Sequence, residues 1–458
     1  MDGMRDRVLG WDVPGEIDPE TAFGALWGTE EHAFWLDTGG AAGTSYLGPA
    51  SWAIDAEEIR LHGGDVLGWL RAERSRWDVD ASGTSPGFAL GIIGWLGYEL
   101  YAETMGLGAA VPRRYPDALL MRVDRALAVD RATGRARLLA RGTAWGGELA
   151  AWRDRVLGVL SDLRMPDGPD APDGPDAPRA APAVRWAYSD EEYLGMIRAC
   201  QDAIGEGDAY VLCLTTEVRV EGVFDPWAVY RRLRRTSPSH HGAFLRAGSV
   251  ALLSASPEQF LAVDREGLVT TKPIKGTRQR GATPGEDATL REALRADEKE
   301  RAENVMIVDL MRNDLSRVCE VGTVEVVRLL DVETYPQVHQ LVSTVAGRLA
   351  PGRDAIDAIA ACFPAGSMTG APKHSAVSIL ARLERRARGL YSGAFGYLGY
   401  DGAADLAMTI RSIVIDEAGA TIGTGGGITA LSVPEAELAE TRLKAAALLG
   451  ALGAQRDE

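Results

Sequence analysis

Short stretches in the second half of the chain are continuously apolar or alternate between apolar and polar residues, and these stretches predict strands. Helical spacing recurs between them, and Ser189 with Glu192 forms a capping-box pattern that opens a helix. Strands mixed with helices favour an α+β (layered α/β) fold. The expected strands are 210–220, 243–247, 250–255, 260–263, 322–328, 340–347, 392–400, 406–415 and 420–423, and the expected helices are about 190–205, 227–236, 288–317, 354–363, 372–386 and 434–450.

The first half of the chain has a weaker pattern of the same kind. Residues 1–30 are expected to be a loose lead-in with one short helix. Residues 119–143 alternate as two strands around a turn, and residues 145–164 suit a helix. The apolar, glycine-rich stretch 88–99 indicates close backbone approach in a sheet or at a strand–helix junction, and we interpret it as core.

A proline-rich tract separates the two halves. Residues 166–178 repeat Pro-Asp-Gly-Pro-Asp-Ala and end on a further proline. Proline removes backbone donors and glycine costs entropy, so this tract is not expected to form a packed element. It therefore predicts an N-terminal region 1–164, a linker 165–184 and a C-terminal region 185–453.

Composition limits the classes of partner. The 458 residues are 46% hydrophobic and 25% charged, with a formal net charge of −16. That charge argues against a nucleic-acid partner, since phosphate contacts need a basic surface. No apolar run approaches the length of a bilayer span, and the charged N-terminus does not resemble a signal peptide, so we expect a cytoplasmic protein with no membrane partner. Buried free thiols are expected at Cys200, Cys213, Cys319 and Cys362, which lack disulfide or zinc spacing.

The stretch from Thr271 to Gly281 gathers the candidate chemistry. Pro273 favours extended backbone, and Gly276 permits a turn closed to other residues. Lys275 stands between them, with arginines following. This pattern suits an anion site, or a lysine whose pKa is lowered by cationic neighbours until its amine is a nucleophile. A solvated basic turn is the alternative from these residues alone.

Further motifs accompany this turn in a fixed order. They are Ser256-Pro-Glu258, the Glu- and Asn-containing stretch 302–315, Gly366-Ser-Met-Thr-Gly-Ala-Pro-Lys373, Tyr391-Ser-Gly393, Ile410-Arg411, Gly423-Thr-Gly-Gly-Gly427 and the acidic stretch 434–444. The series resembles the chorismate-utilising enzymes, which include anthranilate, aminodeoxychorismate, isochorismate and salicylate synthases. The resemblance is strong over about residues 185–453. It implies two large facing β-sheets surrounded by helices, with the active site in the cleft between the sheets.

The turn points to one branch of that family. Residues 273–277 read Pro-Ile-Lys-Gly-Thr, which resembles the aminodeoxychorismate synthases with a lysine nucleophile, whereas anthranilate synthases look like Pro-Ile-Ala-Gly-Thr there. The resemblance implies that Lys275 attacks ring carbon 2 of chorismate, so that the 4-hydroxyl leaves and ammonia enters at carbon 4. Glu258 is implied as the general acid/base, with a pKa raised by burial. Its separation from Lys275 suits two adjacent strands joined by a turn.

Two acidic pairs are the candidate metal ligands. Glu303 and Glu440 match the Mg²⁺ ligands of the family. Glu300 precedes Glu303 by three residues and Glu437 precedes Glu440 by three, so each pair shares a helix face. Facing carboxylate pairs repel unless a cation lies between them, and oxygen-only ligands suit Mg²⁺. Two solvated helix faces are the alternative.

The remaining candidates would contact the substrate. The resemblance implies such contacts for Tyr391, Arg411 and Lys444, and Arg411 suits a bidentate grip on a carboxylate. The other candidate contacts are Thr277, Thr369 and the backbone amides of Gly425, Gly426 and Gly427.

Two departures from the family pattern bear on the product. Val211 stands where many members have lysine or glutamine, and the lysine there activates water in isochorismate and salicylate synthases, so valine argues against both of those activities. Gln340 stands where many members have histidine, with His339 one position earlier, which favours an enzyme that stops after amination. The chain carries no evident glutaminase motif, so ammonia is expected from a separate glutaminase subunit. The alternatives are anthranilate synthase component I and a catalytically silent subunit that binds a glutaminase.

Overall fold

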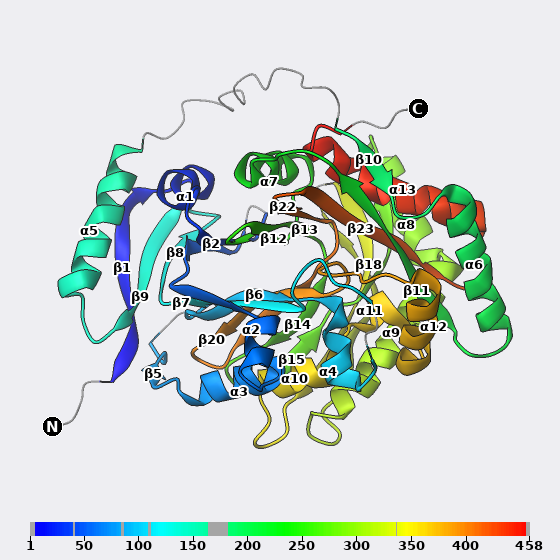
Figure 1. Cartoon of the computed structure of the whole chain (residues 1–458), viewed down its shortest axis with the longest axis horizontal. Coiled ribbons are helices and arrows are strands. Elements are labelled where there is room, and N and C mark those ends of the chain that lie inside the picture. The colour runs from blue at the N-terminus through cyan, green and yellow to red at the C-terminus, as the bar shows by residue number, and fades with distance from the viewer. Residues whose placement is uncertain are drawn as a thin grey trace.

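Two large β-sheets face each other, and helices cover the outer side of each (Figure 1). The computed structural model describes residues 5–39, 42–83, 87–108, 111–163, 182–335 and 337–454. Within these ranges no helix is long and apolar enough to cross a bilayer. The predicted α+β fold with two facing sheets is confirmed.

The larger sheet has 13 strands and draws on both halves of the chain. Its neighbours are antiparallel except for the pair β1 and β5. In spatial order the strands are β10 (Val184–Trp186), β11 (Val211–Val220), β23 (Gly419–Ile428), β22 (Ser412–Asp416), β13 (Val250–Ser256), β12 (His241–Ala247), β2 (His32–Asp37), β3 (Thr44–Pro49), β8 (Arg125–Asp130), β9 (Arg135–Gly142), β1 (Asp6–Glu16) and β5 (Val79–Asp80), with β19 (Gly370–Ala371) beside β11.

The smaller sheet has 10 strands and also combines the two halves. In spatial order they are β16 (Ile274–Gln279), β18 (Val338–Arg348), β15 (Leu268–Thr271), β14 (Gln259–Val263), β21 (Ala404–Met408), β20 (Ala394–Gly399), β6 (Gly91–Leu96), β7 (Ala118–Val123) and β4 (Trp52–Asp55), with β17 (Glu325–Thr334) beside β18.

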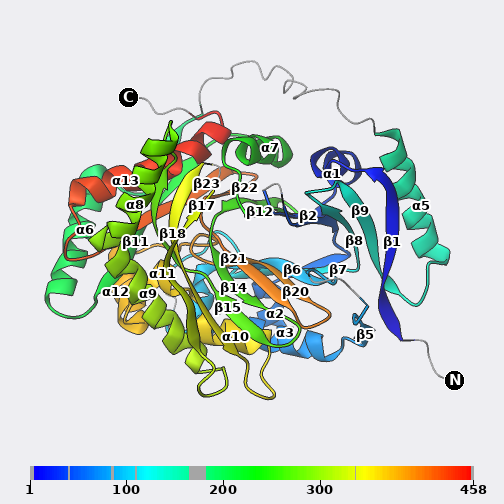
Figure 2. The same ribbon diagram turned by 180° about the vertical axis from the view of Figure 1, so that it is seen from behind.

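The helices form the outer layers (Figure 2). One group packs against the larger sheet: α1 (Pro19–Trp27), α5 (Gly147–Asp162), α7 (Pro226–Thr236) and α13 (Pro434–Ala451), with α6 (Asp190–Gly205) and α12 (Lys373–Glu384) at its β11 end. A second group, α2 (Ala56–Leu61), α3 (Val66–Ser75), α9 (Glu298–Ser316) and α10 (Ala355–Cys362), packs against the smaller sheet. The remaining short segments and helices are η1 (Tyr98–Leu100), α4 (Tyr101–Met105), α8 (Pro284–Ala296) and α11 (Gly366–Thr369).

A separate apolar core joins the two sheets. Phe34 and Leu245 of the larger sheet meet Trp95 and Phe395 of the smaller one in a single cluster of buried side chains. Burial of aromatic and aliphatic area at about 25 cal/mol per Å² makes such a layer a major source of stability. It fixes the position of one sheet relative to the other.

The chain passes from one sheet to the other at three points, and two of them lie within runs that read as single strands. It does so at Asp124, at Pro257–Glu258 and at residues 409–411. The expected single strand 406–415 is therefore wrong, because β21 and β22 belong to different sheets. The expected first strand of 119–143 likewise divides into β7 and β8, which lie in different sheets, and β9 follows the turn.

Three other expectations need correction. The lead-in 1–30 contains β1, which was missed because it lies near the end of the larger sheet with only two of its side chains buried. The helix expected over 288–317 is two helices, because Asp297 ends α8 and its side chain caps α9 by accepting from the Glu300 amide at 3.1 Å. The capping box at Ser189 is confirmed, as are four buried free cysteines.

The domain division remains a prediction. Both sheets combine strands from before and after residues 165–184. The repeated proline tract 166–178 lies outside the described residues.

Candidate active site

The strand that carries Lys275 contains a bulge. β15 and β16 pair in succession with β18, and the register slips between Ile274 and Thr277. Lys275 and Gly276 together stand opposite the single residue Leu341. Gly276 has φ +87°, and a Cβ there would lie 3.1 Å from the Cβ of Glu300. Bulges re-aim side chains, and this one allows α9 to approach the strand closely.

The Lys275 ammonium lies beside a glutamate of α9, over a glycine of β23. A Cβ on Gly427 would lie 3.5 Å from Lys275 Nζ and 3.4 Å from Glu303 Oε2. It would also lie 3.6 Å from Val211 Cγ2, so the valine that replaces lysine or glutamine lines the same spot. Glycine at position 427 keeps this space open for the charged groups.

The expected lowering of the Lys275 pKa is wrong for this arrangement. Burial opposes the charged form, but Glu303 and then Cys213 and Glu258 outweigh it and raise the pKa of Lys275. The arginine expected to lower it, Arg278, turns instead to Asp297 at 2.8 Å. The turn therefore brings the amine into an acidic environment rather than a cationic one.

Glu258 lies where the chain crosses from β13 to β14. It is buried, and it accepts a hydrogen bond from the backbone of Ile274. Glu258 and Lys275 are not on adjacent strands as expected, because Lys275 lies on β16, and β18 and β15 separate β16 from β14. Burial raises the pKa of Glu258 to about 7, although the Ser367 hydroxyl, the Lys275 charge and the Ile274 amide each oppose that rise. A carboxyl with this pKa keeps its proton near neutral pH, as a general acid must.

Arg411 lies at the neighbouring crossing, between β21 and β22. The Arg411 carbonyl accepts from the Ala255 amide at 3.1 Å, and the Glu258 carbonyl accepts from the Met408 amide at 3.0 Å, so the two crossings are joined on both sides. Arg411 has φ +50°, a left-handed conformation that is uncommon outside glycine and is concentrated at functional sites. Among the described residues its guanidinium has no hydrogen-bond or ion-pair partner, which leaves it available for a carboxylate.

The two acidic pairs come from helices on opposite sides of the site. Glu300 and Glu303 lie on α9, and Glu437 and Glu440 lie on α13. Glu303 and Glu437 are buried, whereas the Glu440 side chain is 53% exposed. Burial has the largest effect on Glu303 and raises its pKa. The neighbouring lysines lower this pKa, and the charges of Glu300 and Glu437 raise it further. The pairs are therefore close enough to act on each other.

Lysines partly neutralise these carboxylates. Lys299 Nζ lies 2.9 Å from Glu437 Oε1 and 3.8 Å from Glu303 Oε1. Lys444 Nζ lies 2.8 Å from Glu440 Oε1 and donates to the Gly425 carbonyl at 2.9 Å. The role of Lys299 was missed, although its i,i+4 spacing to Glu303 was a usable signal.

The donor set has the chemistry of a magnesium site. All four side chains offer hard carboxylate oxygens, and two helices present them toward one another. In the described part of the chain, however, no group of three or more His, Cys, Asp or Glu side chains is gathered closely enough to hold a metal ion. Lys299 lies between Glu303 and Glu437, so a metal ion there requires this side chain to move.

The other predicted contacts are unevenly placed. Thr277 is exposed at the edge of the turn, and Thr369 is buried with its hydroxyl donating to the Ala365 carbonyl at 3.1 Å. Gly425, Gly426 and Gly427 lie in strand β23, not in a glycine loop, and pair with β11. A Cβ on Gly426 would lie 3.2 Å from Glu437 Oε2, so these glycines admit the carboxylates.

His339 and Gln340 point to opposite faces of β18. His339 Nε2 lies 3.0 Å from Asp287 Oδ1 of α8, and its Nδ1 lies 2.9 Å from Thr334 Oγ1. Gln340 pairs with Thr277 across the ladder. His339 is thus held in a structural contact, and it does not replace a histidine at position 340.

Beneath the site is a buried ion-pair network that the sequence did not reveal. Arg388 donates to Glu384 Oε1 at 2.7 Å, to the Met368 carbonyl at 2.7 Å and to the Cys213 carbonyl at 2.8 Å. The backbone amide of Arg388 donates to Glu99 at 2.7 Å. These bonds join β11 to the short helix α11, whose Ser367 contacts Glu258. An arginine close to a glutamate at i,i+4 is too common a pattern to single out.

Substitution of Gly423 by alanine tests the placement of Tyr391. A Cβ on Gly423 would lie 2.0 Å from Tyr391 Cγ and 2.4 Å from its Cβ, too close for the ring to rotate away. We expect turnover to fall by about a hundredfold, because small displacements of positioning groups have effects of that size. Gly285→Ala in α8, where nothing lies within 4 Å, is the matched control. Unchanged turnover in Gly423→Ala would show that Tyr391 does not position the substrate.

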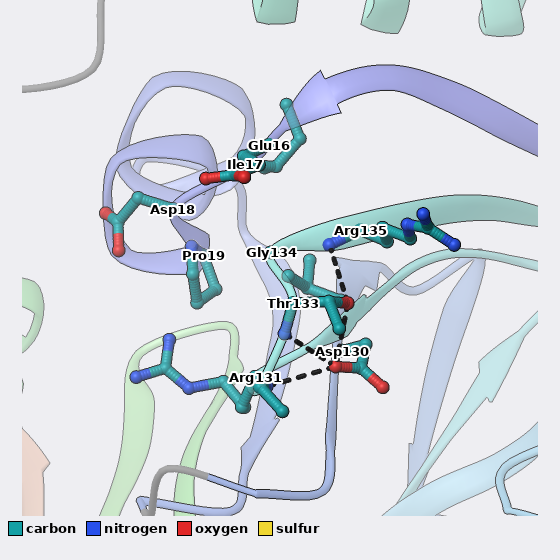
Figure 3. Close-up of a pocket in the computed structure, with 11 residues that line it drawn as sticks. Glu16, Ile17, Asp18, Pro19, Asp130, Arg131, Thr133, Gly134 and Arg135 are labelled. Carbon is teal, nitrogen blue, oxygen red and sulfur yellow. Dashed lines mark hydrogen bonds between the residues drawn. The ribbon is translucent and has the colours of Figure 1, made fainter.

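An open groove elsewhere collects none of the candidate residues. It has a volume of about 610 Å³ and lies between the β1–α1 junction, from Glu16 to Pro19, and the β8–β9 turn, from Val129 to Arg135 (Figure 3). Asp130 shapes that turn by accepting from the Thr133 amide at 2.9 Å. Five strands of the larger sheet separate β8 from β23, so the groove lies away from the acidic pairs.

Comparison with known proteins identifies the family of the chain. The family described as chorismate binding enzyme matches residues 31–450. The chain is 43% identical to an aminodeoxychorismate synthase of Streptomyces griseus, over 97% of this chain and 64% of that protein. It is 38% identical to anthranilate synthase component 1 of Streptomyces coelicolor, over 95% of this chain and 86% of that protein. The chain thus spans less than two thirds of the length of the first relative.

Solved structures share the fold. Anthranilate synthase component I from Streptococcus pneumoniae superposes with a TM-score of 0.73 at 27% identity, covering 97% of this chain and 92% of that one. The menaquinone-specific isochorismate synthase MenF of Escherichia coli superposes with a TM-score of 0.72 at 18% identity, covering 98% and 94%. The second likeness concerns the fold alone.

Proposed function

Because the chain belongs to the chorismate binding enzyme family, we propose that it aminates chorismate at ring carbon 4 to give 4-amino-4-deoxychorismate. The observation that carries the proposal is the placement of the Lys275 amine next to Glu303 and within the field of the buried Glu258. A nucleophile and a nearby buried acid are the groups that displacement of a ring hydroxyl requires.

The chain's own residues divide the reaction between them. Lys275 first loses the extra proton of its ammonium group to water, because the neighbouring carboxylates raise its pKa. The neutral amine then bonds to ring carbon 2, the ring double bonds shift, and the bond from carbon 4 to its hydroxyl breaks. Glu258 gives its proton to the departing hydroxyl, which leaves as water. Ammonia then bonds to carbon 4, the double bonds return, and the Lys275 amine departs. Arg411 binds a substrate carboxylate.

Mg²⁺ and a source of ammonia complete the proposal. Glu303 and Glu440, with Glu300 and Glu437 beside them, would hold Mg²⁺, which when bound supplies positive charge for the ring carboxylate. Ammonia would come from a separate glutaminase subunit. The product would serve 4-aminobenzoate synthesis, for folate or a secondary metabolite, in the cytoplasm.

One assay tests the function and its alternatives. The purified chain is incubated with chorismate, Mg²⁺ and ammonium, and the product is identified by mass and fluorescence. We expect a product with the mass of aminodeoxychorismate and no release of pyruvate. Fluorescent anthranilate with pyruvate would identify an anthranilate synthase component I. The absence of any product would favour a silent subunit that binds a glutaminase.

The pKa of Glu258 predicts the pH dependence. The protonated carboxyl is the active form, and it ionises as the pH rises through about 7. We therefore expect kcat/KM to fall on the alkaline side with an apparent pKa near about 7. Glu258→Gln, which has no acidic proton, should lower kcat/KM by about 10² to 10⁴ and remove this limb. A wild-type profile that is flat from pH 6 to about 9 would contradict the acid role.

A further inference from the structure

Lysine is scarce in this chain, and its positions are therefore informative. It supplies five of the 49 basic residues. Lys272 is exposed, and Lys373 is held by Asp314 at 2.6 Å and the Cys362 carbonyl at 2.7 Å. The other three, Lys275, Lys299 and Lys444, place their ammonium groups among the acidic pairs. Arginine, the usual cation of this chain, is absent from these three places.

Lys299 differs from the other two in what holds it. Lys444 also donates to the Gly425 carbonyl, and Lys275 is carried by a strand. Lys299 lies on α9, its described contacts are the carboxylates of Glu303 and Glu437, and 36% of its side chain is exposed. The two carboxylates that it bridges are only 8% and 5% exposed. Lys299 is therefore a cation with a path to solvent, placed on carboxylates that have almost none.

We propose that Lys299 is a built-in counter-ion that binds the carboxylates of Glu303 and Glu437 in place of a divalent cation and must swing outward before that cation binds. This inference rests on the proposed magnesium site. An ammonium is a compact charge on a flexible stem, so it can occupy and leave a site of cation size, whereas a planar guanidinium cannot do so in the same way. Its positive charge offsets the repulsion between the two buried carboxylates.

The proposal has two measurable consequences. A cation that competes for the same oxygens weakens Mg²⁺ binding, so Lys299→Gln should bind Mg²⁺ at least about tenfold more tightly than the wild type. In chelator, the same variant should unfold at a lower temperature than the wild type, because its carboxylates lack a partner. Mg²⁺ should raise the unfolding temperature of the variant more than that of the wild type. Calorimetric titration with Mg²⁺ alone and thermal unfolding with and without Mg²⁺ measure both effects without turnover.

The matched control is Arg312→Gln. Arg312 lies on the same helix, its side chain is 51% exposed, and its substitution removes the same unit of charge. We expect it to bind Mg²⁺ as the wild type does. Equal Mg²⁺ affinity in the wild type and Lys299→Gln would overturn the inference and leave the magnesium site standing. No Mg²⁺ binding by either protein would instead overturn the proposed magnesium site.

A measurement on the wild-type protein avoids dependence on a variant that folds poorly. An amine-acylating reagent followed by peptide mass spectrometry reports the accessibility of each lysine, and five lysines are easily resolved. Mg²⁺ should increase the acylation of Lys299 several-fold and leave Lys373 unchanged as an internal reference. Acylation of Lys299 that falls or stays constant when Mg²⁺ binds would contradict displacement of its side chain.

Discussion

Replacement of Lys275 by alanine is expected to lower the formation of aminated chorismate by about a thousandfold or more, with either ammonium or a glutaminase as the nitrogen source. The amine lies over Gly427 beside Glu303, and the bulge at Gly276 aims it there. Loss of the nucleophile removes the step that expels the ring hydroxyl. Turnover followed by product mass, on protein whose thermal unfolding matches the wild type, measures the effect.

Two further variants separate the covalent role from a simple role in charge balance. Lys275→Arg keeps the positive charge but presents a guanidinium that stays protonated, so it should be as inactive as Lys275→Ala. Lys272→Ala, at an exposed position three residues earlier, should keep turnover near the wild-type value. Substantial turnover by Lys275→Arg would show that the site needs a cation and not a nucleophile.

Replacement of Arg388 by methionine is expected to lower the free energy of unfolding by about 3–5 kcal/mol, because it leaves Glu384 buried without its charged partner. Arg388 and Glu384 are each 3% exposed, and the guanidinium also holds carbonyls of β11 and α11. Chemical denaturation measures the loss. Addition of Glu384→Gln should recover part of it, since the second change removes the uncompensated charge.

Arg382 provides the control for the same helix region. It is exposed on α12, and Arg382→Met should change the free energy of unfolding by no more than about 0.5 kcal/mol. An Arg388→Met protein as stable as Arg382→Met would show that the network contributes specificity of packing and not stability.

Local patterns in the sequence predicted individual helices and strands well, but they did not predict where the chain crosses from one sheet to the other. The capping box at Ser189 and the helical pattern of 434–450 are each contained within a short stretch of sequence. The structure has the helices that they predict, α6 and α13. Residues 406–415 read as one strand, because the apolar run continues across the point where the chain leaves one sheet for the other. Which sheet a strand joins depends on partners far along the chain, and a local period carries no such information.

The same distinction applies to the site. Motifs singled out Lys275 and Glu258 as candidates, because their residue types and order are local. The surroundings of Lys275 were predicted to be positively charged but are acidic, because the charges nearest to it in sequence are not the nearest in space. Lys299 and Arg388 were missed for the same reason, since their partners Glu437 and Met368 lie on other elements.

The paired crossings at Glu258 and Arg411 make catalytic alignment a property of how the two sheets are docked. Each residue is anchored by one strand in each sheet, so a sideways slip of one sheet would move the acid and the guanidinium out of alignment without breaking any bond within either sheet. Conservative changes among Phe34, Trp95 and Phe395 would then impair turnover through this misalignment, in addition to their cost in stability.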